Sequence, residues 1–300
     1  PTKRRHINCR CSSLTRKWND LLVYFRLPNE KFTEIKMSGN VEVLVRELND
    51  SYVLITGGTS GIGFASAQKF AESGTPKVAI NGRNEERGMA ALEKLRKRWP
   101  KTEFMLVLAD VTIASEVTKM VNEVTEAFGR VDVLVSTAGG NFPPVLFHKL
   151  PIDEIQDVFD GFALGSMLCA SAVLPGMSAQ KGGVIISVGS DAGKVPTPGE
   201  TVIGAAMAAI SMFTRGLSME AKRNGVRVNC LSPSLVRNTR TWDLVFEAEF
   251  SKKLFAKAEA MANLGITDPE DQAEMVVYMA SPAAARMTGQ SISINGGISA

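Results

Sequence analysis

The chain has 300 residues, of which 45% are hydrophobic and 22% are charged, and its formal net charge is +3 at pH 7. A chain of this length and apolar content can bury a sizeable core, in one large domain or two small ones. No run approaches the roughly 18 apolar residues that a membrane-spanning helix needs, so we expect no membrane span. The four cysteines, Cys9, Cys11, Cys169 and Cys230, lack the spacing of a metal site or a disulfide framework, which predicts free thiols, no bound metal and a cytoplasmic location.

Positive charge is concentrated at the beginning of the chain. Residues 1–36 contain nine Lys and Arg residues and three acidic residues, whereas the rest contains 25 basic and 28 acidic residues. The rest of the chain therefore offers no basic surface for nucleic acid. We interpret residues 1–50 as a basic, poorly ordered extension before a domain at 51–300. The extension has the Arg-rich composition of an organelle-import peptide, would also suit a polyanion, or precedes a natural start at Met37, which is the interpretation that we favour.

From residue 51 onward, short apolar runs alternate with helical patterns. The runs predict strands at Tyr52–Thr56, Lys77–Asn81, Glu103–Leu108, Val131–Ser136, Gly183–Val188, Val226–Leu231 and Ser291–Ile294. The patterns between them predict helices at Gly61–Ser73, Glu85–Arg98, Ile113–Phe128, Ile152–Ala179, Thr201–Arg223 and Pro269–Ala280. Apolar strands separated by helices give right-handed βαβ units. The sequence thus predicts an α/β fold with a single Rossmann-like, doubly wound parallel sheet of about seven strands and helices on both faces.

The segment 234–267 interrupts this alternation. It is long and mixed in composition, and it carries Trp242, Phe246, Phe250 and Phe255. An insertion of this size at the carboxyl edge of a parallel sheet is usually a lid over a ligand. We therefore predict a substrate flap at 234–267 and a small hydrophobic ligand, such as an acyl, alicyclic or aromatic molecule.

The stretch that points to function is Thr56–Gly63, a glycine-rich turn between the first predicted strand and the first predicted helix. Glycines let the backbone bend sharply and approach a ligand, and a helix N-terminus offers free N–H groups and positive potential to a phosphate. The turn therefore predicts a dinucleotide pyrophosphate site. Its expected contacts are Gly57, Thr59, Ser60, Gly61, Ile62 and Gly63.

The end of the second predicted strand indicates the choice of cofactor. Sites for NAD place a carboxylate there, which bonds the ribose hydroxyls and repels a 2′-phosphate. This chain has Asn81-Gly82-Arg83-Asn84 instead, with no acid and with a guanidinium that can hold a phosphate bidentately. We therefore expect NADP(H) to be favoured over NAD(H).

Ordered motifs over roughly residues 50–298 resemble those of the short-chain dehydrogenase/reductase family. They are Thr56–Gly63, Asp110-Val111, Ser136–Gly139 in place of N-N-A-G, Gly183–Ser190, Val228–Ser234 in place of a strand with a P-G turn, and Met287–Gly297 in place of T-G-Q…D-G-G. The resemblance implies an oxidoreductase for carbonyls or alcohols, and a homo-oligomer paired through the helices at 161–179 and 201–223. It further places Asp110, Val111, Ala138, Gly139, Gly140, Pro233 and Val236 at the cofactor.

The catalytic positions depart from the family pattern. In the family, an Asn, a Ser, a Tyr and a Lys act together: the Ser orients the substrate oxygen, the Tyr transfers its proton, and the Lys lowers the Tyr pKa. The family spacing assigns these positions to Phe162, Ser190, Ile203 and Met207, in that order. Only Ser190 is retained, and aliphatic side chains cannot transfer a proton. A catalytic member would need a non-standard proton donor.

Several side chains near these positions are candidates for a replacement role. They are Asn141, His148, Asp191 and Glu200, with Asn238 or Thr239 near the family's carboxamide-binding Thr. The stretch Ala138–Phe142 also resembles the dienoyl-CoA reductase branch, although that branch keeps the Lys that Met207 replaces.

Three functional hypotheses follow. The first is an NADP-binding oxidoreductase for a hydrophobic carbonyl, alcohol or acyl-type substrate. The second is a catalytically silent relative that serves as a ligand-binding scaffold or a subunit. The third, non-redox chemistry as in halohydrin dehalogenases, is the least favoured, because those proteins keep the Ser and Tyr and lose the glycine turn.

Overall fold

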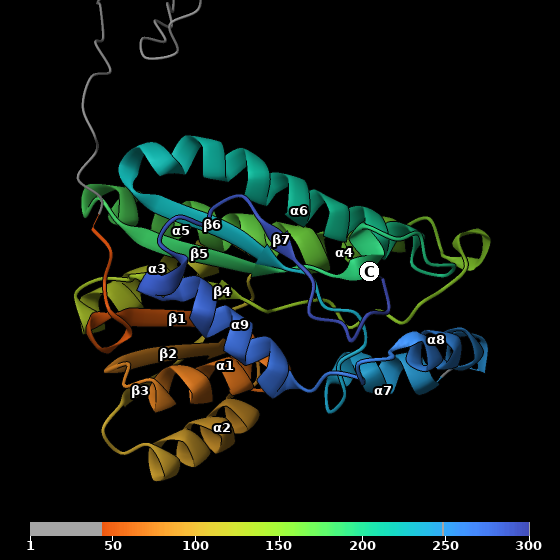
Figure 1. The fold of residues 1–300 in the computed structure, drawn as a ribbon, viewed down its shortest axis with the longest axis horizontal. Helices are drawn as coiled ribbons and strands as arrows, with labels where there is room; N and C mark the ends of the chain where they lie inside the picture. Colours follow the sequence, from red (N-terminus) through yellow and green to blue (C-terminus); the bar gives the residue numbers. More distant parts are fainter. Residues whose placement is uncertain (1–43, 248, 300) are drawn as a thin grey trace, which may run out of the picture. The chain divides into compact units, whose positions relative to one another are not determined.

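A computed structural model describes residues 44–247 and 249–299 of the chain. The described strands form one seven-stranded sheet in the order β3-β2-β1-β4-β5-β6-β7, and every neighbouring pair is parallel (Figure 1). The strands are β1 (Tyr52–Thr56), β2 (Lys77–Gly82), β3 (Glu103–Leu108), β4 (Val133–Ser136), β5 (Gly183–Val188), β6 (Val226–Leu231) and β7 (Ser291–Ile292). The predicted fold class is confirmed.

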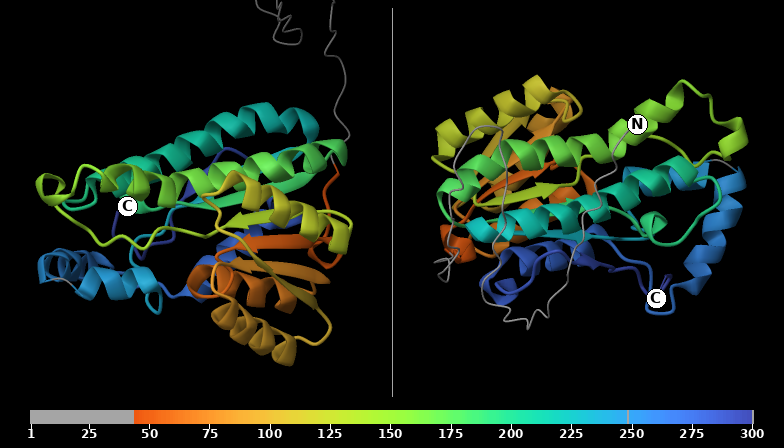
Figure 2. Two further views of the ribbon diagram at one scale, coloured as in Figure 1. Left: turned by 180° about the vertical axis from the view of Figure 1, so that it is seen from behind. Right: turned by 90° about the horizontal axis from the view of Figure 1, so that it is seen from above.

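Helices cover both faces of the sheet, as the two views in Figure 2 show. They are α1 (Gly61–Glu72), α2 (Glu85–Arg98), α3 (Ala114–Phe128), α4 (Glu154–Phe159), α5 (Gly165–Ala179), α6 (Thr201–Ala221), α7 (Arg240–Glu247), α8 (Glu249–Met261) and α9 (Pro269–Ala280). Side chains alternate along each strand, so that Val53 and Ile55 pack with α1, α2 and α9, whereas Leu54 packs with α3 and α5. The sheet therefore lies between two apolar layers, one on each face.

Two helical stretches, Glu154–Ala179 and Thr201–Asn224, are long and apolar enough to cross a membrane by length and composition. The apolar runs of the sequence predict no such stretch, because Gly, Ser and Thr residues interrupt them. These residues lower the average hydropathy of each helix only slightly, so both helices still meet the criterion. Core helices of globular domains meet the same criterion. Here Cys169 of α5 and Ile210 of α6 are buried in the apolar clusters of the domain.

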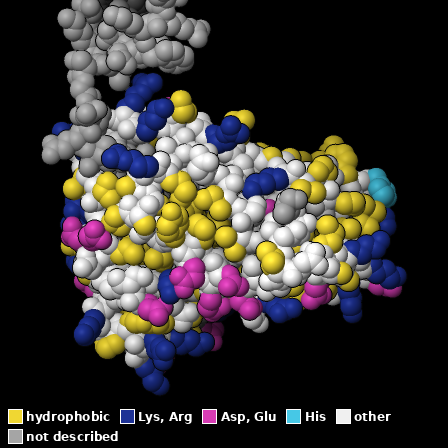
Figure 3. Space-filling model, in the orientation of Figure 1, with side chains coloured by type: hydrophobic (Ala, Val, Ile, Leu, Met, Phe, Trp, Pro, Cys, Tyr) yellow, Lys and Arg dark blue, Asp and Glu magenta, His cyan; other side chains and the backbone are white. Residues whose placement is uncertain are grey.

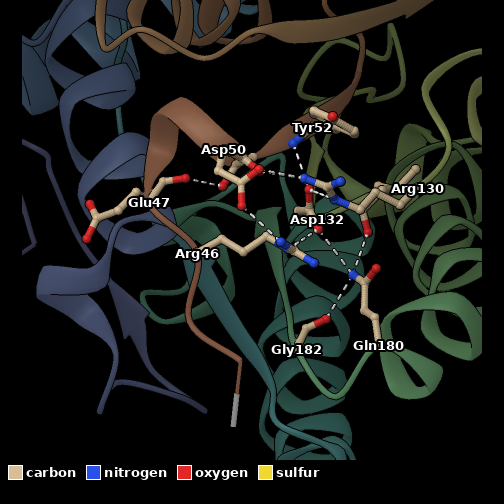
Figure 4. A network of polar contacts seen from close by, with 10 residues as sticks. Arg46, Glu47, Asp50, Tyr52, Arg130, Asp132, Gln180 and Gly182 are labelled. Carbon is tan, nitrogen blue, oxygen red and sulfur yellow. Dashed lines mark hydrogen bonds and ion pairs between the residues drawn. The ribbon is translucent and has the colours of Figure 1, made fainter.

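The predicted extension lies outside the described residues as far as residue 43. Residues 44–50 pack with the domain whose predicted start is residue 51. The backbone N–H of Leu44 donates to the Lys181 carbonyl over 3.0 Å. The Nε atoms of Arg46 and Arg130 lie 3.0 and 2.8 Å from the buried carboxylate of Asp132 (Figure 4).

The segment predicted as a substrate flap, residues 234–267, contains α7 and α8, and we call it the lid segment. Its ends are joined by a parallel bridge between Val236 and Thr267. Leu235, Val245 and Phe255 form its own small apolar cluster. The lid segment follows β6, so it begins at the carboxyl edge of the sheet.

Candidate active site

The glycine turn packs tightly against the end of β4. Gly57 and Gly61 have φ values of +67° and +51°, in the left-handed region that glycine favours. A Cβ on Gly57 would lie 2.7 Å from the backbone nitrogen of Ala138, and one on Gly63 would overlap the Thr137 hydroxyl. The turn therefore requires glycines for its conformation and its packing, and it leads directly into the N-terminus of α1.

Thr137 takes the place of the second Asn in the family's N-N-A-G motif. Its backbone N–H and its hydroxyl both donate to the Thr56 carbonyl, over 3.1 and 2.6 Å. The backbone N–H of Ala138 lies 3.5 Å from the Thr56 hydroxyl. Ala138 and the two glycines that follow it are thereby held beside the glycine turn.

Arg83 and Asp110 meet at the ends of β2 and β3. An Arg83 guanidinium nitrogen lies 3.2 Å from an Asp110 carboxylate oxygen. The other oxygen accepts from the Thr112 backbone N–H and hydroxyl, over 2.9 and 2.7 Å. Burial alone would raise the pKa of Asp110, but these hydrogen bonds and the Arg83 charge outweigh it and lower the pKa. The Arg83 side chain is 65% exposed, so it can still reach a ligand.

Phe162, Ile203 and Met207, which the family spacing assigns to three catalytic positions, lie in or against one apolar cluster. Ile203 and Met207 are 9% and 8% exposed, and Phe162 packs against the cluster that they form with Val158 and Ala163. Phe162 lies in a π-helical turn, Asp160–Leu164, between α4 and α5. The ring centroid of Phe142, from the loop after β4, is 6.0 Å from that of Phe162. Phe162, Ile203 and Met207 thus have apolar surroundings.

Ser190 follows β5 and is half-buried. Its hydroxyl accepts from the Ala192 backbone N–H over 3.2 Å, which caps the short helical turn Asp191–Gly193. Asp191 is 5% exposed, and its carboxylate is engaged by side chains near residue 295. Asp191 is therefore a structural hydrogen-bond acceptor.

The remaining candidates differ in their surroundings. Glu200 immediately precedes α6, and burial raises its pKa to about 7. His148 is exposed in the turn Phe147–Lys149, and Figure 3 shows a histidine side chain, in cyan, at the surface. The Asn141 side-chain oxygen accepts from Nε of Arg240, the first residue of α7, over 3.3 Å. That contact between the loop after β4 and the lid segment could not be anticipated from local sequence.

Asn238 and Thr239 differ in their contacts. The Thr239 methyl group would lie 3.4 Å from a Cβ on Gly61, so Thr239 lies beside the phosphate turn. Asn238 instead donates to the Asp268 carboxylate over 3.0 Å. Val236 is buried at the base of the lid segment.

A small pocket of about 60 Å³ adjoins the apolar cluster. Its walls are mostly apolar and include Phe142, Leu150, Val158 and Ile203, with Glu154 as the acidic member. Within residues 44–247 and 249–299, no three His, Cys, Asp or Glu side chains are grouped to hold a metal ion. Cys169 and Cys230 are free and buried, and burial raises the pKa of both thiols. Cys9 and Cys11 lie outside the described residues.

The fold and the glycine turn define a Rossmann-type nucleotide-binding oxidoreductase. The family described as short chain dehydrogenase matches residues 51–249, and the chain belongs to this short-chain dehydrogenase/reductase family.

Relatives match most of the chain. A 3alpha-hydroxysteroid dehydrogenase of Mediterraneibacter gnavus is 31% identical over 250 residues, covering 83% of this chain and 97% of the relative. The 3-oxoacyl-(acyl-carrier-protein) reductase FabG of Chlamydia muridarum is 33% identical over 248 residues, covering 82% and 96%. The crystal structure of gox2181 has a TM-score of 0.77 and 28% identity, covering 84% of this chain and 96% of that one.

Proposed function

We propose that the protein is an NADP(H)-dependent oxidoreductase for a hydrophobic carbonyl, alcohol or acyl-type substrate, with a proton donor other than tyrosine. The observation that carries the cofactor preference is the Arg83 guanidinium directly after β2, which is 65% exposed although one of its nitrogens contacts the Asp110 carboxylate, and β2 itself carries no acidic residue. Arg83 would bind the 2′-phosphate, and the backbone N–H groups of Ser60, Gly61 and Ile62 would face the pyrophosphate. The close approach of Gly57 and Gly63 to β4 fits a backbone shaped for that ligand.

The apolar surroundings of the site support a hydrophobic substrate. Phe142, Phe162, Ile203 and Met207 occupy the region where the family's polar groups meet the substrate, and the lid segment adds its own aromatic cluster. Burying apolar surface contributes roughly 25 cal/mol per Å², so this lining favours an apolar ring or chain over a polar sugar. The names of two relatives, a hydroxysteroid dehydrogenase and an oxoacyl reductase, accord with such a substrate.

Glu200 is the proton donor that we favour. It precedes Ile203 by three residues, which places it about one helical turn before the family's Tyr position. Burial raises its pKa to about 7, so the carboxyl group can both hold and release a proton near neutral pH. The bound cofactor would supply hydride to the carbonyl carbon, while Glu200 gives its proton to the carbonyl oxygen and Ser190 orients that oxygen.

We also propose a homo-oligomer paired through α5 and α6. Met212 and Met219 lie seven residues apart on α6 and are 65% and 59% exposed. Large apolar side chains on one helix face favour association. A monomer by light scattering at micromolar concentration would contradict this proposal.

Calorimetric titration with NADPH and NADH tests the cofactor assignment. We expect micromolar binding of NADPH, and a loss of about tenfold or more in Arg83→Ala, because a charge-assisted hydrogen bond is worth roughly 1.5–3 kcal/mol. Arg98→Ala, which removes the same charge from the far end of α2, is the matched control. If the wild type binds neither nucleotide but Ile203→Tyr/Met207→Lys does, the proposed redox function is wrong.

The donor is tested with oxosteroids and 3-oxoacyl thioesters as candidate substrates. For a substrate that is reduced, Glu200→Gln should lower kcat by about 10²–10⁴-fold and remove the pH dependence near 7. An unchanged pH–rate profile in Glu200→Gln would exclude Glu200 as the donor.

A further inference from the structure

We propose that Asp191 is the structural anchor of the lid segment: its buried carboxylate and its backbone hold both ends of that segment to the loop after β5. This role concerns the shape of the site and does not require the proposed NADP(H) chemistry. The residues that join Asp191 to the lid segment are Ser293–Ser299, which we call the closing segment.

The Asp191 carboxylate is saturated with neutral donors. One oxygen accepts from the hydroxyls of Ser293 and Ser232, over 3.0 and 3.4 Å. The other accepts from the Asn295 side-chain amide and the Ser299 hydroxyl, over 2.6 and 2.5 Å. Three of these four donors belong to the closing segment. The carboxylate therefore fixes that segment more strongly than any single contact would.

No ion pair to Asp191 occurs among residues 44–247 and 249–299. Lys194 approaches it indirectly, because its ammonium group donates to the Ser293 hydroxyl over 2.8 Å. A carboxylate that is 5% exposed and has no cation in contact depends on its hydrogen bonds to offset the cost of its burial. Moving the closing segment away would leave the buried carboxylate without three of its four donors and would destabilise the fold. This cost holds the closing segment in place.

The closing segment holds the far end of the lid segment. The Gly296 carbonyl accepts from the Leu264 backbone N–H over 3.0 Å. Gly296 has a φ of +65°, and a Cβ there would overlap the Gly265 carbonyl, so the two backbones are in close contact. Ile298 packs against the apolar cluster of the lid segment.

The near end of the lid segment is held by the same residue. The Asp191 backbone N–H donates to the Pro233 carbonyl over 2.8 Å, one residue before the lid segment begins. The Ser232 hydroxyl meets the Asp191 carboxylate, and the Ser232 backbone N–H donates to the Ile292 carbonyl over 2.7 Å. Both ends of the lid segment are thus connected to Asp191, the residue that follows Ser190 in the chain.

Hydrogen–deuterium exchange on the full, unliganded chain tests this inference with Asp191→Asn. The variant keeps the size of the side chain but removes its charge and replaces one acceptor oxygen with an NH₂ group, so the four donors of the closing segment and Ser232 share a single neutral oxygen. We expect exchange at 262–266 and 293–298 to become at least about tenfold faster, while 52–108 is unchanged. Asp243→Asn, which removes an exposed carboxylate from α7, is the control and should leave all segments unchanged.

The reciprocal variant Asp191→Asn/Asn295→Asp restores a carboxylate facing an amide. Its exchange at the two segments should return to within about threefold of wild type. Equal exchange in Asp191→Asn and wild type, an equal acceleration at 52–108, or a failure of the reciprocal variant to restore protection would each overturn the inference. Because nucleotide is absent, none of these outcomes bears on the proposed activity, which the calorimetry tests separately.

Discussion

Asp132 is the buried junction of the network in Figure 4, and Asp132→Asn should destabilise the domain substantially. Its side chain is 4% exposed and contacts the Nε atoms of Arg46 and Arg130, at 3.0 and 2.8 Å. It also accepts from the Tyr52 backbone N–H over 2.9 Å and from the Gln180 amide over 3.3 Å. The substitution removes the buried charge that pairs with both Nε atoms, and it leaves only the exposed Asp50 carboxylate in contact with Arg46 and Arg130, at 2.9 and 3.0 Å.

The magnitude follows from the exposure of the two arginines. Removing one partner of a fully buried pair costs about 3–5 kcal/mol. The Arg46 and Arg130 side chains are 23% and 25% exposed, so water can partly solvate them. We therefore expect a loss of roughly 2–3 kcal/mol, which lowers Tm by about 4–12 °C for a domain of this size.

Thermal unfolding followed by circular dichroism measures this loss. The matched control is Glu103→Gln, which breaks an exposed pair in which the Glu103 side chain is 59% exposed and lies 3.6 Å from Lys77. That pair should contribute about 0–1 kcal/mol. If Asp132→Asn lowers Tm no more than Glu103→Gln, the network does not hold residues 44–50 and the sheet together as argued.

Three further predictions concern buried groups. Burial raises the pKa of Glu200 in the folded state from 4.5 to about 7, so between these pH values the folded state holds a proton that the unfolded state releases. The free energy of unfolding should therefore fall as pH rises from 4.5 to about 7. Thermal unfolding of Glu200→Gln, measured over the same pH range, should lack this part of the fall. Gly63→Ala would press a methyl group onto the Thr137 hydroxyl and should cost about 1–3 kcal/mol in urea unfolding, with loss of NADPH binding. Arg227 is 7% exposed and donates to the Met279 and Ala280 carbonyls at the end of α9, so Arg227→Met should cost roughly 2–4 kcal/mol by thermal unfolding.

The sheet could be predicted because its signals are local. Each strand is a short apolar run next to a helical pattern, and the burial of both faces follows from that alternation. The last strand was predicted to reach Ile294 but ends at Ile292. The reason is distant in sequence: Ser293 and Asn295 turn toward Asp191, more than 100 residues away. The start of β4 at Val133 likewise follows the engagement of Asp132 with Arg46 and Arg130.

The candidate site also combines features set by local sequence with features set by contacts that are distant in sequence. The glycine turn could be identified from sequence because glycine is needed there for backbone conformation, which depends on a few residues. The environment of a titratable group depends on packing from elsewhere in the chain. Asp191 and Glu200 were equivalent as sequence candidates, yet one is bound by four donors and the other is buried enough to raise its pKa.

Phe162, Ile203 and Met207 pack together as one unit. Ile203 and Met207 share a cluster whose buried members are all apolar or a neutral thiol, and Phe162 packs against it. Met207→Lys alone would place an ammonium group in that cluster with no carboxylate among its members, and burial would lower its pKa. A lysine at 207 therefore needs a polar partner, which the tyrosine of the double variant Ile203→Tyr/Met207→Lys supplies. The proposed proton donor, Glu200, therefore lies outside the members of the cluster, immediately before α6.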